Sequence, residues 1–123
     1  MIIDGEKCDR GLVIDAPWID LILDQKKKWE MRTKNTKIRG RIGLIRKGTG
    51  KIFGTATLFD CFGPLNSKEF KENSDKHCIP PHMERECFQR GWVFAWCLKD
   101  IFVFTTPVSY EHKIGAVTWV KLN

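Results

Sequence analysis

Short strand-forming segments dominate this sequence, and only one early stretch has the periodicity of an amphipathic helix. Segments that are rich in β-branched and aromatic residues, or that alternate in polarity, cover residues 11–15, 29–33, 40–47, 51–62, 92–98, 101–105 and 116–122. Gly48-Thr49-Gly50 predicts a hairpin turn, and Lys99-Asp100 predicts a second turn. No regular alternation of strands with helices is present, so the pattern favours an α+β domain built on a small mixed β-barrel.

The one clear helix is predicted to begin at Ala16-Pro17-Trp18, because a proline in the first turn of a helix loses no hydrogen bond. Apolar residues then recur at steps of three and four, and the helix should end near Lys26 or Lys27. One or two further short helices are expected over residues 67–73 and 82–90, the latter stopped by Gly91. We expect these segments to cover one end of the barrel.

Length and composition indicate one domain over residues 1–123. Hydrophobic residues make up 42% of the chain, which is enough for one core without disulfide or metal crosslinks. The five cysteines are Cys8, Cys61, Cys78, Cys87 and Cys97. Their odd number and the lack of a C-x-x-C pair argue against a disulfide framework and favour a reducing cytoplasm. We expect no export signal, no membrane association and no cofactor.

Two histidines and two cysteines lie within eleven residues in the second half of the chain and could in principle bind a metal. They are His77, Cys78, His82 and Cys87. Their spacing fits no common zinc site, so no metal is predicted.

Positive charge is concentrated in one part of the chain. Residues 26–51 contain eleven lysines and arginines and one acid, Glu30, a net charge of +10, whereas the other residues contain ten bases and fourteen acids. Such a block attracts polyanions, and the attraction weakens with salt because counterions are released. A lysine-rich face that only keeps the domain in solution is the alternative.

The segment after the predicted helix alternates large apolar residues with charged ones. On a strand this places Glu30 and Arg32 on one face, and Trp29 and Met31 on the other. One face is therefore expected to be buried and the other to carry chemistry.

Several motifs in a fixed order resemble the ASCH domain family. The longest is the run from Ala16 to Arg32, with a Pro-Trp helix start followed by Lys27, Glu30 and Arg32. The others are Gly40-Arg41-Ile42, Gly54-Thr55-Ala56 with Asp60-Cys61, Ala95-Trp96 with Leu98, Pro107-Val108 with Tyr110, and Gly115-Ala116-Val117-Thr118-Trp119. The resemblance extends over roughly residues 11–122.

The resemblance implies a PUA-like β-barrel with a cleft between the barrel and the Pro-Trp helix, and RNA or a nucleotide as the ligand. Together with the chemistry of the residues, it gives Trp18, Lys27, Glu30, Arg32, Arg41 and His77 as the expected ligand-binding residues. Several of them have a second interpretation. Lys27 can be an ordinary exposed lysine, and Glu30 can form a salt bridge that only orients a lysine or arginine. Trp18 can stack on a base or belong to the core. Arg32 can bind phosphate or only pair with Glu30. His77 can act as an acid or base, or lie in a solvated loop.

An RNA- or nucleotide-binding module is the first hypothesis, and a hydrolase acting on RNA or a modified nucleoside is the second. In the hydrolase, Lys27 would stabilise developing negative charge and Glu30 would act as general base. Some similar proteins hydrolyse acetylated cytidine with a lysine, a threonine nucleophile and a distant glutamate. Here Lys27 matches the lysine, but Glu30 occupies the threonine position, and a carboxylate is a poor replacement for an activated hydroxyl.

Overall fold

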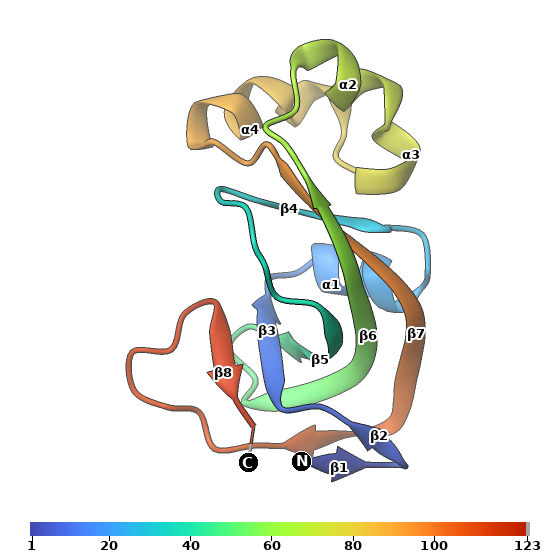
Figure 1. Cartoon of the computed structure of the whole chain (residues 1–123), viewed down its shortest axis with the longest axis vertical. Helices are drawn as coiled ribbons and strands as arrows, with labels where there is room; N and C mark the ends of the chain where they lie inside the picture. The colour runs from blue at the N-terminus through green and yellow to red at the C-terminus, as the bar shows by residue number, and fades with distance from the viewer. Residues whose placement is uncertain (123) are drawn as a thin grey trace.

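A six-stranded sheet, curled into half of a barrel, forms the body of the computed structural model, which describes residues 1–122 (Figure 1). Its strands are β3 (Arg10–Ile14), β4 (Trp29–Arg32), β5 (Gly40–Arg46), β6 (Lys51–Phe62), β7 (Phe94–Ser109) and β8 (Trp119–Lys121). The strand order is β4-β7-β6-β5-β3-β8, and every pair is antiparallel except β3 with β5. The expected α+β class and mixed barrel-like sheet are confirmed.

The long strands β6 and β7 curve from the end that holds the termini to the base of the helical end (Figure 1). Their pairing shifts register at three points, and such irregularities bend a sheet and increase its twist. The predicted turn at Lys99-Asp100 is wrong: β7 is one continuous strand of 16 residues. Asp100 adopts a left-handed conformation, with φ of 52°, while pairing with β6 continues on both sides of it.

The hairpin between β5 and β6 is confirmed at Gly48-Thr49-Gly50, where both glycines have positive φ angles. A second hairpin was not predicted. It joins β1 (Ile2–Ile3) to β2 (Glu6–Lys7) through Asp4-Gly5, both with positive φ. Asp-Gly is a typical signal for such a turn.

Helix α1 (Trp18–Leu23) begins where the Pro-Trp motif predicts but ends earlier than Lys26. Gln25 takes a left-handed conformation, with φ of 62°, and this ends the helix. The backbone N–H groups of Lys26 and Lys27 both bond to the Leu21 carbonyl, so the two lysines leave the helix as a tight turn into β4.

Three more helices and a short 3₁₀ turn gather at one end of the sheet, while both termini lie at the other end (Figure 1). They are α2 (Ser67–Glu72), α3 (Ser74–His77), η1 (Pro81–Met83) and α4 (Glu84–Arg90). Residues 67–72 and 84–90 confirm the predicted helical segments, and α3 is one helix more than expected. Asn66 and Glu69 form a capping box that fixes the start of α2, and Gly91, with φ of 76°, ends α4.

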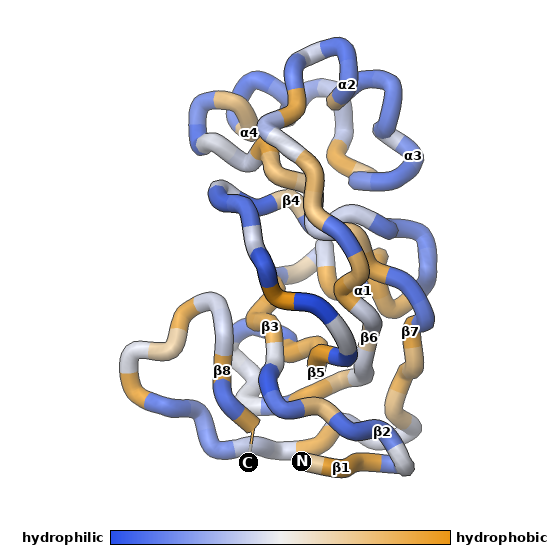
Figure 2. The backbone as a smooth tube through the Cα atoms, in the orientation of Figure 1, coloured by the Kyte–Doolittle hydropathy of each residue, from blue (hydrophilic) through white to orange (hydrophobic). Residues whose placement is uncertain are grey.

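The core consists of three clusters. The first lies between the sheet and α1 and includes Leu12, Ile22 and Leu58. The second joins β4 and β7 to the helical end and includes Trp29 and Phe70. The third closes the end near the termini. Figure 2 shows the matching pattern, with hydrophobic stretches along the strands and mostly hydrophilic residues in α2 and α3. Among residues 1–122 no helix is long and apolar enough to cross a membrane.

Candidate functional site

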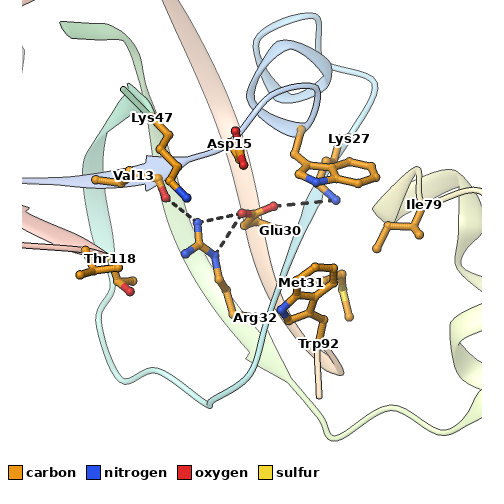
Figure 3. Close-up of a pocket in the computed structure, with 12 residues that line it drawn as sticks. Val13, Asp15, Lys27, Glu30, Met31, Arg32, Lys47, Ile79, Trp92 and Thr118 are labelled. Carbon is orange, nitrogen blue, oxygen red and sulfur yellow. Dashed lines mark hydrogen bonds and ion pairs between the residues drawn. The ribbon is translucent and has the colours of Figure 1, made fainter. Parts of the chain in front are cut away.

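A cleft of about 270 Å³ opens where α1, β4 and the segment before β8 meet (Figure 3). Its walls are formed by Val13, Asp15, Trp18, Lys27, Glu30, Met31, Arg32, Lys47, Ile79, Trp92, Val117 and Thr118. Four of the six predicted ligand-binding residues are therefore in one place: Trp18, Lys27, Glu30 and Arg32. The structure does not bring Arg41 or the side chain of His77 into this group.

The alternation along β4 explains why the charged side chains share the cleft. Glu30 and Arg32 lie on one face of the strand, and Trp29 packs into the apolar cluster on the other, as the sequence predicts. Met31 belongs to that cluster too and also contributes to the cleft wall. Pairing of β4 with β7 holds the strand in place.

Glu30 is the centre of the charged group and is only 6% exposed. Its carboxylate oxygen Oε2 accepts a hydrogen bond of 3.1 Å from Nε of Arg32 and forms an ion pair with Nη2 of the same side chain at 2.8 Å. Its other oxygen lies 3.9 Å from Nζ of Lys27. Figure 3 shows the Glu30 carboxylate between the two cations, with Asp15 and Lys47 on one side and Met31 and Trp92 on the other. A carboxylate held by such charge-assisted bonds has one fixed orientation.

Lys27 is almost completely buried, at 2% exposure. Its ammonium donates a hydrogen bond of 2.5 Å to the backbone carbonyl of His77 and lies 5.1 Å from the centre of the Trp18 ring. Burial lowers the pKa of Lys27, and the Glu30 carboxylate opposes that shift. An ordinary exposed lysine is therefore ruled out as the interpretation of Lys27.

Arg32 connects β4 to β3 across the cleft. Besides Glu30, it donates a hydrogen bond of 2.8 Å to the Val13 carbonyl, and its guanidinium lies 5.6 Å from the centre of the Trp96 ring. Its side chain keeps some exposure, so it can still meet a ligand at the cleft surface. The predicted ion pair with Glu30 is present, and it leaves the ligand-binding interpretation open.

Two tryptophans form part of the cleft wall, Trp18 at the start of α1 and Trp92 after α4. Trp92 was missed, because it comes from the helical end of the domain, far from Trp18 in sequence. Lys27, Arg32 and Lys47 carry three positive charges here, and Asp15 and Glu30 carry two negative charges. The cleft is thus nearly balanced in charge, less basic than the block of residues 26–51 suggests.

The comparisons with known proteins agree with this arrangement of helix, strand and sheet. The sequence matches the ASCH domain family over residues 12–117. The chain belongs to the ASCH family. ASCH domains are PUA-like and are associated with RNA binding. No curated protein sequence matches the chain significantly.

Solved ASCH structures from Zymomonas mobilis share the fold of this ASCH domain. The crystal structure of ASCH from that organism superposes with a TM-score of 0.75 at 14% identity, over 93% of this chain and 87% of the other. A tyrosine-to-phenylalanine variant of the Zymomonas protein gives 0.75 at 15% identity, over 95% and 91%. A serine-to-alanine variant gives 0.72 at 15% identity, over 93% and 87%.

Arg41 of this ASCH domain lies outside the cleft and holds the β1–β2 hairpin to the sheet. It pairs with the carboxylate of Glu6, and donates hydrogen bonds to the hydroxyl of Thr57 at 3.0 Å and to the carbonyl of Asp100 at 2.6 Å. Hydrogen bonds from Thr55 and Arg41 lower the pKa of the Glu6 carboxyl. These contacts give Arg41 a structural role in this domain.

The side chain of His77 is buried and points away from the cleft. Its Nδ1 accepts a hydrogen bond of 2.9 Å from the N–H of Ile79, so Nε2 carries the proton and donates to the Phe70 carbonyl at 2.7 Å. The ring also stacks on Phe70, with centroids 4.1 Å apart. Its backbone carbonyl positions Lys27, which is the contribution of His77 to the site. In residues 1–122 no three His, Cys, Asp or Glu side chains are grouped to hold a metal.

His77 should make folding sensitive to acid. Burial lowers its pKa in the folded state. The unfolded chain therefore takes up a proton below about pH 6.5 that the folded chain does not bind. The free energy of unfolding keeps its full value above that pH. As the pH falls further, it is expected to decrease by up to about 1.4 kcal/mol per pH unit until the folded ring titrates. Denaturant unfolding between pH 7.5 and 5 measures this slope.

The control is His82→Gln, which removes an exposed histidine and should keep the slope. His77→Gln should flatten it. An unchanged slope in His77→Gln would show that other groups cause the acid sensitivity.

Proposed function

We propose that this ASCH domain binds single-stranded RNA and holds one nucleoside in the cleft. The observation that carries the proposal is the fixed, buried carboxylate of Glu30 beside two tryptophans. Unstacked bases are usually held on aromatic side chains and read by hydrogen bonds along their edges. The association of the family with RNA and the +10 charge of residues 26–51 agree with this ligand.

Each group in the cleft has a role in this proposal. Trp18 and Trp92 provide surfaces for the base. Glu30 accepts a hydrogen bond from an exocyclic amino group, as carboxylates do with the N4 amino group of cytosine. Arg32 and Lys47 meet the sugar and phosphate. The volume of about 270 Å³ lies just below the usual range of ligand pockets, which suits one nucleoside and excludes a stack of several bases.

The test is binding of cytidine monophosphate and of an eight-nucleotide RNA by the wild type and by Trp92→Ala. Loss of one stacking surface is expected to weaken both affinities about tenfold. Thr49→Ala, in the β5–β6 turn outside the cleft, is the control and should leave both unchanged. If Trp92→Ala binds both ligands as tightly as the wild type does, or if Thr49→Ala no longer binds them, the binding site lies elsewhere.

The salt dependence of RNA binding should distinguish the lysines of the cleft. If about four phosphates are neutralised, the log–log slope against salt is expected to be roughly −3. Lys47 is exposed, so Lys47→Met should reduce the slope by about 0.7. Lys27 is buried and bonded to the His77 carbonyl, so Lys27→Met should leave the slope unchanged. Equal effects of the two substitutions would mean that Lys27 reaches the phosphates after all.

A hydrolase acting on a modified nucleoside is the second candidate, favoured by one observation. A buried lysine with a lowered pKa beside a carboxylate in a cleft is an arrangement common at catalytic sites. Glu30 would take a proton from water, and Lys27 would stabilise the negative charge that develops on the attacked group. Product formation from acetylcytidine by the wild type, reduced about 100-fold or more in Lys27→Met, would favour this candidate over simple binding.

A further inference from the structure

A second hollow, of about 360 Å³, lies on the other side of Lys27 from the cleft. It is bounded by the turn after α1, the start of β4, the end of α3, the end of β6 and the first half of β7. We call the aromatic residues in it, Trp29, Phe59 and Phe62, the aromatic platform. We call the three lysines around it, Lys28, Lys76 and Lys99, the lysine rim.

Two of the three platform rings are exposed apolar side chains, whereas Trp29 belongs to the second core cluster. Phe59 and Phe62 are 45% and 46% exposed, and the Phe62 ring lies 6.0 Å from the Trp29 ring. Residues three apart on a regular strand point to opposite faces. The register of β6 against β7 shifts between Leu58 and Asp60, and both phenylalanines line the same hollow. The irregularity in the strand therefore creates the platform.

The lysine rim carries exposed positive charge directly beside these rings. Nζ of Lys76 lies 5.1 Å from the centre of the Trp29 ring, and Nζ of Lys99 lies 4.8 Å from that of Phe59. All three rim lysines are exposed, and Asp100 is the one acid that lines the hollow within residues 1–122. Aromatic rings surrounded by cations match single-stranded nucleic acid, whose bases stack while its phosphates are neutralised.

The hollow and the cleft are neighbours at the start of β4. Lys27 lines both, and β4 carries Glu30 towards the cleft and Trp29 towards the platform. Because β4 is an edge strand of the sheet, the route from a nucleoside in the cleft to Phe59 and Phe62 leads past the Lys27–Lys28 turn.

We propose that the aromatic platform and the lysine rim bind the nucleotides that follow the one held in the cleft. The proposal rests on the proposed function and extends it from one nucleoside to a short single strand. The domain then recognises one base in the cleft and gains affinity, with little dependence on sequence, from stacking outside it.

The experiment compares cytidine monophosphate with an eight-nucleotide single-stranded RNA, using the double variant Phe59→Ala/Phe62→Ala. Loss of two stacking rings is expected to weaken octamer binding about 10- to 100-fold and to leave monophosphate binding unchanged. Phe102→Ala is the matched control, because Phe102 is 41% exposed on β7 but lies outside both hollows. It should change neither affinity.

The outcomes separate the two proposals. If the double variant binds the octamer as tightly as the wild type does, the platform proposal is overturned, whether or not the monophosphate binds in the cleft. If the octamer binds only when the platform is intact and the monophosphate does not bind at all, the platform proposal is supported and nucleoside binding in the cleft is overturned. No binding of either probe by the wild type overturns both. Self-association of the wild type that the double variant loses, with RNA affinity unchanged, assigns the surface to a protein partner and overturns the proposal.

Discussion

Replacing Glu30 with glutamine is expected to lower the free energy of unfolding by about 3 kcal/mol. The substitution leaves Lys27 buried without its counter-ion and replaces the carboxylate that pairs with Arg32 by a neutral amide. Breaking one partner of a buried ionic group is costly because the remaining charge stays out of water. Urea unfolding at pH 7.5, followed by tryptophan fluorescence, measures the change.

A double-mutant cycle with Lys27→Met tests the cause. Removing Lys27 alone costs about 1 kcal/mol, because the hydrogen bond to the His77 carbonyl is lost while a buried charge is also removed. The double variant lacks both the Glu30 and the Lys27 charge, so neither remains buried without the other. Its loss of unfolding free energy should therefore be smaller than the sum of the two single losses, by about 1 kcal/mol or more. Strict additivity would show that Glu30 and Lys27 do not stabilise each other.

Gly54→Ala is expected to destabilise the domain by about 3 kcal/mol, although the change adds one methyl group. A Cβ at Gly54 would overlap the backbone carbonyl of Phe102 on β7 and would lie 3.2 Å from a methyl group of Leu23 in α1. Neither the β6–β7 pair nor the packing of α1 can move away without loss of contacts elsewhere. Thermal or urea unfolding of the purified variant measures the loss.

The control for this variant is Gly48→Ala in the β5–β6 turn. A Cβ there meets no atom within 4 Å, so only the positive φ of 83° opposes the substitution. A cost of about 1 kcal/mol is expected. If Gly48→Ala were the more damaging change, close packing of β6 against β7 would not be the reason for glycine at position 54. The comparison gives a physical basis for the Gly54-Thr55-Ala56 motif.

Local patterns along the chain predicted most of the elements. The Pro-Trp start of α1, the glycine that ends α4 and the glycine turn before β6 act within a few residues, so the sequence displays them directly. The same holds for β4, whose alternation separates Glu30 and Arg32 from Trp29. The family resemblance then pointed to a cleft beside α1.

Long-range packing decided the features that the sequence does not display. A turn at Lys99-Asp100 looks plausible locally, but pairing of β6 with β7 on both sides keeps one continuous strand. Arg41 belongs to the basic block in sequence, but the β1–β2 hairpin places Glu6 against it.

The sequence by itself determined the α+β class, the main strands and the charged face of β4, because these depend on propensity and periodicity over short distances. Only the tertiary structure decided that Lys27 is buried on the His77 carbonyl and that Trp92 joins Trp18 in the cleft. Those contacts join residues about 50 or more positions apart, and each depends on how the helical end packs against β4. Burial and charge pairing are properties of that packing, so no local pattern in the chain specifies them.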